Sequence, residues 1–178
     1  IKFDLFIHAA GVTDDEIKKY GNISSLKRST KALNKLVNYL LINKCTNFVY
    51  ISSQRVYSNF YKPAIAIFDE DKSKVKATTI YEKCHLESEN IYKKVSRIKN
   101  CKVLIIRPGA VYGFSKHKNK NSRPDLIQHS FPNSLIKNNK IILKSSGKQF
   151  RNFSYNEDIG KIVSNWLIQN KKQKLLIT

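Results

Sequence analysis

The fold of this chain is decided by Asn47-Phe48-Val49-Tyr50-Ile51-Ser52-Ser53-Gln54-Arg55-Val56-Tyr57, an apolar strand that runs into a hydroxyl-rich turn. Short apolar runs of this kind are typical of strands buried on both faces of a parallel sheet. Similar runs predict strands at Phe3 to Ala9 and at Lys102 to Ile106. Between them, residues 22–44 and 79–97 carry apolar side chains at helical spacing and predict two helices. This order of strands and helices favours right-handed crossovers and a parallel sheet, as in an α/β fold.

The pattern changes after Gly113, where a basic, Asn-rich loop begins. The later elements that we expect are a helix at 124–138, a short strand at 141–143, an extended segment at 149–155, an amphipathic helix at 156–169 and a strand at 175–177. No repeat and no separate linker interrupts the chain. We therefore expect the residues after Gly113 to add a small part to the core and then to return to it.

The composition fits one domain with a strong positive charge. The 178 residues suffice for a core, and 41% of them are hydrophobic. The formal net charge is +20, from 33 basic and 13 acidic residues, which opens a nucleic-acid interpretation. The lysines are spread along the whole chain rather than gathered in one stripe, so this interpretation is the weaker one. An anionic small substrate would also benefit from the positive field.

Cysteine and methionine usage bears on the setting of the chain. Cys45, Cys84 and Cys101 have no metal-ligand spacing, and their odd number excludes a full disulfide framework. We predict no metal site and a reduced, cytoplasmic setting. No apolar run reaches the roughly 18 residues of a membrane span. The chain contains no methionine, so we expect Ile1 to be an internal residue of a longer protein.

Three segments predict a site with acid/base chemistry. Tyr81 opens the second predicted helix, and His85 lies four residues later on the same helical face. Ser53 lies in the turn after one strand, and a Pro/Gly turn at 107–113 follows the next. The carboxyl ends of parallel strands meet at one edge of the sheet, so these segments are expected to meet there. A serine hydroxyl, a tyrosine acid/base and a backbone cradle would serve proton transfer to and from an alcohol.

Five motifs in this order and spacing resemble the extended short-chain dehydrogenase/reductases, the NAD-dependent epimerase/dehydratase family, over essentially the whole chain. The motifs are His8-Ala9-Ala10-Gly11, Ser52 to Tyr57, Tyr81, Arg107 to Gly113, and Gly147 to Ile159. The resemblance implies a Rossmann-like doubly wound parallel sheet, present in part, that binds NAD or NADP. By it, residues 1–113 are the C-terminal portion of the NAD(P)-binding domain. Residues 114–178 are then part of the substrate-binding region, with a return to the core.

The resemblance also implies roles for single residues. It implies catalytic positions at Ser53, Tyr81 and His85. The residues it places against the cofactor are Ala9, Ala10, Gly11, Ser52, Tyr81, His85, Pro108, Gly109 and Val111. The residues it places against the substrate, a nucleotide-linked sugar, are Ser53, Ala110 and Arg151. Arginine suits the diphosphate of such a substrate because its guanidinium forms two parallel hydrogen bonds with an oxyanion.

The chain departs from the family pattern at three points. It has no Gly-rich pyrophosphate loop, and the asparagine usual in the early helix is replaced around Leu26. Most importantly, His85 stands where the family has its catalytic lysine, which also bonds the nicotinamide ribose. Histidine is mostly neutral at pH 7 and has a shorter reach. Gln54 and Arg55 stand where the 4,6-dehydratases of the family carry an acidic pair, which disfavours dehydration.

These observations favour an NAD(P)-dependent nucleotide-sugar epimerase or reductase. Such an enzyme transfers hydride at a sugar hydroxyl or keto carbon, and the replacement of the family's lysine by His85 is the change that would impair its activity. The alternative is a catalytically inactive remnant that serves as a binding or interaction module. A basic nucleic-acid binder is a third and weaker hypothesis. We expect a cytoplasmic protein that is able to form a homodimer and makes no membrane contact.

Overall fold

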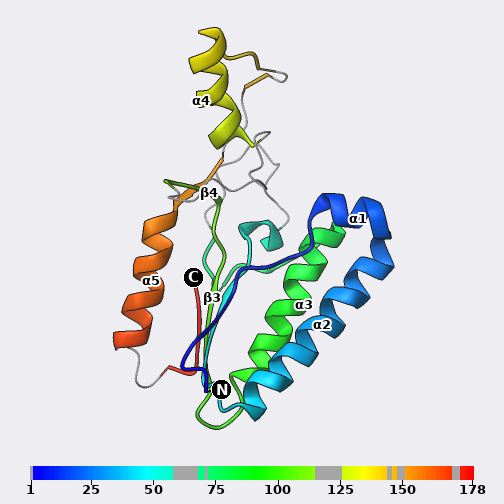
Figure 1. The fold of residues 1–178 in the computed structure, drawn as a ribbon, viewed down its shortest axis with the longest axis vertical. Helices are drawn as coiled ribbons and strands as arrows, with labels where there is room; N and C mark the ends of the chain where they lie inside the picture. Colours follow the sequence, from blue (N-terminus) through cyan, green and yellow to red (C-terminus); the bar gives the residue numbers. More distant parts are fainter. Residues whose placement is uncertain are drawn as a thin grey trace.

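The computed structural model describes residues 2–57, 68–70, 72–114, 126–143, 146–147, 151–169 and 173–178. Figure 1 shows how the elements within these residues are arranged. They are β1 (Phe6–His8), α1 (Asp14–Tyr20), α2 (Asn22–Ile42), β2 (Asn47–Ile51), the 3-10 turn η1 (Gln54–Tyr57), α3 (Ile80–Val95), β3 (Lys102–Ile106), β4 (Ala110–Tyr112), α4 (Ile127–Asn138), β5 (Phe153–Tyr155), α5 (Asn156–Gln169) and β6 (Leu175–Ile177). None of the described helices is long and apolar enough to cross a membrane.

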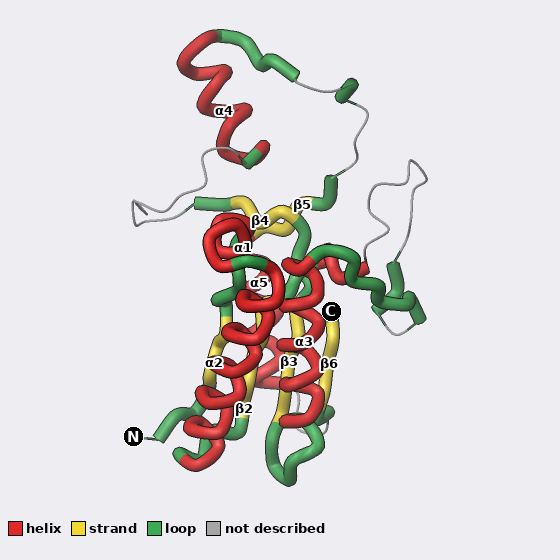
Figure 2. Tube along the Cα trace, turned by 90° about the vertical axis from the view of Figure 1, so that its right-hand side faces the viewer, coloured by secondary structure: helices red, strands yellow, loops and turns green. Residues whose placement is uncertain are grey.

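The core is a parallel sheet whose described strands follow the order β1-β2-β3-β6. The register places Phe48 of β2 beside both Phe6 and Val103, and Leu104 of β3 beside Leu176. α2 and α3 cover one face of this sheet, and α5 covers the other (Figure 1). The turned view in Figure 2 shows α4 well apart from the sheet, beyond the β4–β5 pair. The predicted α/β fold with a parallel sheet is confirmed.

Alternation along the central strands builds a hydrophobic core on each face of the sheet. Every second residue of β2 and β3 faces α2 and α3, and the residues between them face α5. The first core includes Leu33, Val37, Leu40, Phe48, Tyr50, Ile91, Tyr92, Val95, Val103 and Ile105. The second includes Val49, Leu104, Ile106, Val163 and Trp166. Burial on both faces explains why these strands carry unbroken apolar runs.

Most predicted elements lie where the sequence pattern places them. The strand at Lys102–Ile106 and the helix at Asn156–Gln169 have the predicted bounds. The first strand is shorter than predicted, Phe6–His8 rather than Phe3 to Ala9. The predicted strand at 141–143 is wrong: these residues are exposed, and none of the described strands pairs with them. The starts of the segments predicted from 124 and from 149 lie outside the described residues.

Two elements are absent from the sequence-based prediction. α1 begins at a capping box, in which Thr13 Oγ1 accepts from the Glu16 N–H at 3.2 Å and Glu16 Oε2 accepts from the Thr13 N–H at 3.0 Å. β4 lies in the segment interpreted as a turn and pairs in parallel with β5. Ala110 lies opposite Phe153 in this pair. The pair therefore attaches the C-terminal part to the carboxyl end of β3.

Gly109 tests how much the contact between β4 and β5 contributes to stability. A Cβ at this position would overlap the backbone carbonyl of Asn152. Gly109→Ala is therefore expected to separate the strands and to lower the free energy of unfolding by about 1–3 kcal/mol. Gly160→Ala is the matched control, because a Cβ there meets nothing within 4 Å and alanine is the better helix former. Thermal unfolding compares the two variants, and equal stability would contradict the expectation.

Candidate active site

The serine turn is held at the carboxyl ends of β2 and β3. Its backbone continues the ladder beyond the strands, because the Ser52 N–H donates to the Ile106 carbonyl at 2.7 Å and the Gln54 N–H donates to the Pro108 carbonyl at 3.0 Å. Ser53 lies between these two anchors and is 9% exposed. Backbone bonds on both sides therefore fix the serine hydroxyl at the edge where open α/β sheets bind their ligands.

The start of α3 brings Tyr81 to the same site. Thr79 caps this helix, since its Oγ1 accepts from the Glu82 N–H at 3.3 Å while Glu82 Oε2 accepts from the Thr79 N–H at 2.9 Å. The centroid of the half-buried Tyr81 ring lies 4.6 Å from that of the His85 ring. The predicted spacing of four residues thus brings the tyrosine and the histidine into contact on one helical face.

Arg55 connects the serine turn to Tyr81. Its backbone N–H donates to Ser53 Oγ at 3.3 Å. Its guanidinium carbon lies 4.5 Å from the centroid of the Tyr81 ring, which is a cation–π contact. Its Nε lies 3.7 Å from Glu82 Oε1, beyond hydrogen-bond distance. Neither catalysis nor binding is predicted for this side chain from the sequence, so the structure adds a cation beside the tyrosine.

His85 is buried beside the end of β1 and is neutral at pH 7. It is 7% exposed, and its Nδ1 shares a hydrogen bond of 2.7 Å with the Tyr50 hydroxyl. Burial lowers the pKa of His85 to about 4; the Glu89 carboxylate opposes this shift, and the Arg55 charge adds to it. Its Nε2 faces Gly11, where a Cβ would lie 3.6 Å from it. His85 can therefore supply a hydrogen bond from Nε2, but not a positive charge.

A buried ion pair ties these elements together. Glu89 of α3 is fully buried and binds Arg107 through two hydrogen bonds, Nε to Oε1 at 2.9 Å and Nη2 to Oε2 at 2.6 Å. Ser52 Oγ donates to Glu89 Oε1 at 2.7 Å, and Arg107 Nη1 donates to the Tyr57 hydroxyl at 2.7 Å. The network joins α3, the end of β3, the serine turn and η1. Its hydrogen bonds offset the cost of burying two charges.

The network changes the interpretation of two residues. Ser52 is expected against the cofactor, but the structure commits its hydroxyl to Glu89. Glu89 is missing from the sequence-based site, although a signal for it exists. It lies among Ile91 and Tyr92 on the apolar side of the helix, and a glutamate is almost never fully buried unless it is paired.

The Pro/Gly turn and the late segment meet beside the serine turn. The Ala110 N–H donates to the Asn152 carbonyl at 2.8 Å, two residues after the Pro108 carbonyl that anchors the serine turn. Arg151 directly precedes Asn152 and is exposed, and Val111 is exposed on β4. The structure therefore brings the backbone of the predicted diphosphate-binding segment to the same end of the sheet as the serine turn.

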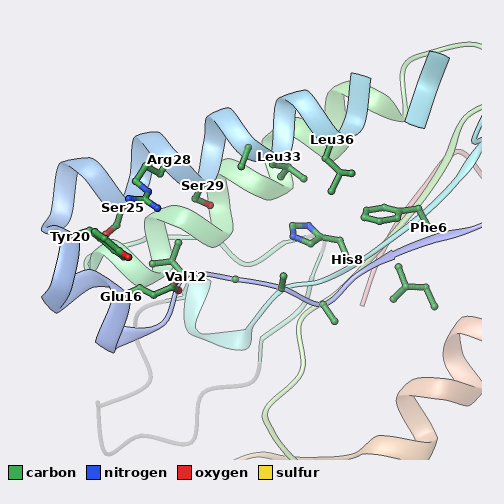
Figure 3. Close-up of a pocket in the computed structure, with 15 residues that line it drawn as sticks. Phe6, His8, Val12, Glu16, Tyr20, Ser25, Arg28, Ser29, Leu33 and Leu36 are labelled. Carbon is green, nitrogen blue, oxygen red and sulfur yellow. The ribbon is translucent and has the colours of Figure 1, made fainter. Parts of the chain in front are cut away.

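The end of β1 borders a cavity. Ala9, Ala10 and Gly11 are small and exposed, and they line one side of a cavity of about 490 Å³ between β1, α1 and α2. Figure 3 shows Ser29 and Arg28 of α2 on its other side. Its volume is in the range of small-molecule sites. The cavity shares residues 9–11 with the predicted cofactor site and lies beside, rather than over, the serine and tyrosine.

The described residues hold no group of three or more His, Cys, Asp or Glu that could bind a metal ion. The three cysteines are free and buried. What the structure brings together is a serine, a tyrosine, a neutral histidine and an arginine at the carboxyl edge of a parallel sheet, next to a strand end of small residues. This arrangement defines the class: a Rossmann-like α/β protein with a serine turn and a helix-borne tyrosine at the carboxyl end of its parallel sheet.

The profile of the "NAD dependent epimerase/dehydratase family" matches residues 1–175. The chain therefore belongs to this family, which confirms the resemblance drawn from its motifs. It is 26% identical over 172 residues to the "dTDP-D-glucose 4,6-dehydratase" of Dictyostelium discoideum, covering 89% of this chain and 37% of that protein.

Solved structures share the fold over nearly the whole chain. A UDP-galactose 4-epimerase superposes with a TM-score of 0.71 at 17% identity, covering 99% of this chain and 55% of its own. MoeE5 in complex with UDP-glucose and NAD superposes with a TM-score of 0.74 at 17% identity, covering 98% of this chain and 56% of its own. The dTDP-glucose 4,6-dehydratase DesIV from Streptomyces venezuelae superposes with a TM-score of 0.72 at 16% identity, covering 98% of this chain and 50% of its own. The chain spans about half the length of these structures, and they confirm the Rossmann-like fold.

Loss of the buried carboxylate should destabilise the protein strongly. Glu89→Gln leaves the Arg107 charge buried without its counter-charge and is expected to lower the free energy of unfolding by about 3–5 kcal/mol. Glu87→Gln, at an exposed position of the same helix, is the control and should change little. Denaturant titration measures both variants. A loss below about 1 kcal/mol in Glu89→Gln would show that the pair does not hold the site.

The depressed pKa of His85 predicts a loss of stability in acid. Histidine titrates near 6.5 when unfolded and near 4 here, so the unfolded state takes up the proton first as the pH falls. The free energy of unfolding should therefore decrease between about pH 6.5 and pH 4, and this contribution should stay constant above that window. Denaturant titrations across this range should give a smaller decrease for His85→Gln than for the wild type. The same decrease in both proteins would contradict the assignment.

Proposed function

We propose that the protein is an NAD(P)-dependent nucleotide-sugar epimerase or reductase. The observation that supports the proposal is that Arg55 contacts both Ser53 Oγ, through its backbone N–H, and the ring of Tyr81. Membership of the family supports the reaction class. The relatives support the substrate class, because one structure contains UDP-glucose with NAD and another is a UDP-galactose 4-epimerase.

The residues at the end of β1 fit the nicotinamide half of a dinucleotide. Residues 9–11 carry no side chain larger than a methyl group, and a Cβ added to Gly11 would reach to 3.5 Å from His85 Cε1. These small, exposed residues leave the backbone at the end of β1 open to close approach by a flat ligand, which His85 would border. The cofactor would lie there, with residues 108–111 along its other side, and it supplies the acceptor and donor of the hydride when bound.

The two hydroxyls would handle the proton that accompanies the hydride. Tyr81 would take the proton of the sugar hydroxyl when hydride leaves its carbon, and return it when hydride comes back. Ser53 would hold the same sugar oxygen through its own hydroxyl. His85 would add a hydrogen bond toward the cofactor, and Arg151 would hold the diphosphate of the substrate. Return of hydride to the opposite face of the keto sugar gives epimerisation at C4.

A second candidate is a catalytically inactive remnant that serves as a binding module. The neutral, buried state of His85 favours it, because the permanent cation of the family's lysine is absent from that position. For either candidate we propose a cytoplasmic location, which the free and buried cysteines support. We also propose a homodimer, which the exposed Ile23 and Ile42 on α2 support.

Tyr81→Phe in the full-length gene product separates the two candidates. An active enzyme is expected to lose about 10²–10⁴-fold in kcat, because the acid/base group is removed, while its affinity for NAD stays unchanged. Tyr39→Phe, at an exposed position of α2, is the control and should match the wild type. Nicotinamide absorbance and the epimer ratio measure turnover on UDP-, dTDP- and GDP-hexoses. Wild-type protein that binds NAD and a nucleotide sugar without any turnover would support the remnant.

A further inference from the structure

Arg55 brings a positive charge to the site, and not all hydrogen-bond donors of its guanidinium have partners among the described residues. Its guanidinium carbon lies 4.5 Å from the centroid of the Tyr81 ring, and its backbone is bonded to Ser53 Oγ. The side chain is 34% exposed, so it reaches the surface of the site. Its Nε is buried and has no hydrogen-bond partner in the part of the chain that the structure describes. Because Nε is buried, a ligand can reach this guanidinium only through its two Nη groups.

Glu82 approaches the guanidinium but is held by the start of α3. Its Oε2 accepts from the Thr78 N–H, the Thr78 hydroxyl and the Thr79 N–H, at 2.7, 3.0 and 2.9 Å. Its Oε1 stays 3.7 Å from Arg55 Nε. This carboxylate therefore orients the arginine by charge without forming the two parallel hydrogen bonds that a guanidinium makes with an oxyanion. A ligand oxyanion can accept two parallel hydrogen bonds from the two Nη groups instead.

The position of the reacting carbon indicates which oxyanion this is. In the proposed function, Ser53 and Tyr81 hold the oxygen on C4 of a pyranose. The diphosphate is attached to C1, on the far side of the ring from C4. C6 is attached to C5, directly beside the reacting carbon. An oxyanion next to Tyr81 is therefore a carboxylate at C6 and not a phosphate.

We propose that Arg55 binds the C6 carboxylate of a hexuronic acid, so that the substrate is a nucleotide-linked uronate. The inference rests on the proposed function and names its substrate class. A uronate carries one negative charge more than the corresponding hexose, and the net charge of +20 favours it for that reason as well. Arg55 is thus a specificity-determining residue, and Glu82 positions it.

The test compares matched ligands on the full-length gene product with NAD present. The pairs are UDP-glucose with UDP-glucuronate, dTDP-glucose with dTDP-glucuronate and GDP-mannose with GDP-mannuronate, and calorimetry gives the Kd ratio within each pair. For the pair that carries the preferred base, wild-type protein should bind the uronate at least about tenfold more tightly. Arg55→Met should abolish this preference by weakening the uronate alone. Arg55→Lys should keep part of it, because the charge stays while the planar fork is lost.

Controls make each outcome decisive. Arg97→Met removes an exposed arginine just past the C-terminal end of α3 and should keep the wild-type ratio. Circular dichroism establishes that each variant is folded, and Arg55→Lys replaces Arg55→Met if the latter is not. Equal affinity for both members of every pair overturns the inference and leaves the proposed function standing. Equal weakening of both members by Arg55→Met also overturns it, since the arginine then serves the phosphates. Binding of no nucleotide sugar at all overturns the inference and the proposed function together.

Discussion

The buried pair of Glu89 and Arg107 is the interaction on which the site depends. Arg107 follows the last residue of β3, and Glu89 lies two turns after Tyr81 on α3, so the pair fixes helix and sheet against each other at this edge. Ser52 adds a third bond to the same carboxylate and thereby fixes the serine turn. The serine turn that carries Ser53 and the helix that carries Tyr81 are thus both held by residues of this network. The pair is weak evidence for stability in itself, because two charges must lose water, but it is a strong constraint on geometry.

We propose that the two functions of the family's lysine, a hydrogen bond and a positive charge, are divided between two residues of this chain. His85 occupies the lysine's position, is buried and neutral, and shares a hydrogen bond with Tyr50. Arg55 supplies a permanent positive charge from the serine turn and reaches the ring of the same tyrosine. Arginine stays charged at any physiological pH, so the site keeps a cation even though the histidine is not one. The substitution at His85 therefore has to be considered together with the residue at position 55.

The sequence predicts those parts of the molecule that depend on local pattern. The strand at Lys102–Ile106 and the helix at Asn156–Gln169 follow from an apolar run and from helical periodicity, and both have the predicted bounds. β4 could not be predicted, because a three-residue strand is stable only through its partner strand, whose paired residues lie 43 positions later in the chain. The predicted strand at 141–143 is wrong for a related reason. Apolar residues alone do not make a strand, because a strand also needs a partner to pair with.

In the candidate site, too, the sequence predicts the residues that belong to motifs but not those whose role depends on tertiary packing. Motif order places Ser53, Tyr81 and His85, and the structure brings them to one place. The role of Glu89 and the direction of the Arg55 side chain depend on tertiary packing. α1, by contrast, could have been predicted, since Thr13 and Glu16 form a capping box that is visible in the sequence.

Transfer of hydrogen from substrate to cofactor tests the central claim most directly. The full-length gene product, loaded with NAD, is incubated with nucleotide sugars that carry deuterium at C4, and the cofactor is released and analysed by mass spectrometry. The account predicts deuterium in the reduced nicotinamide of the wild-type protein and none in that of a variant without the Tyr81 hydroxyl. A wild-type protein that binds both the dinucleotide and the sugar, yet leaves no deuterium on the cofactor, would contradict it.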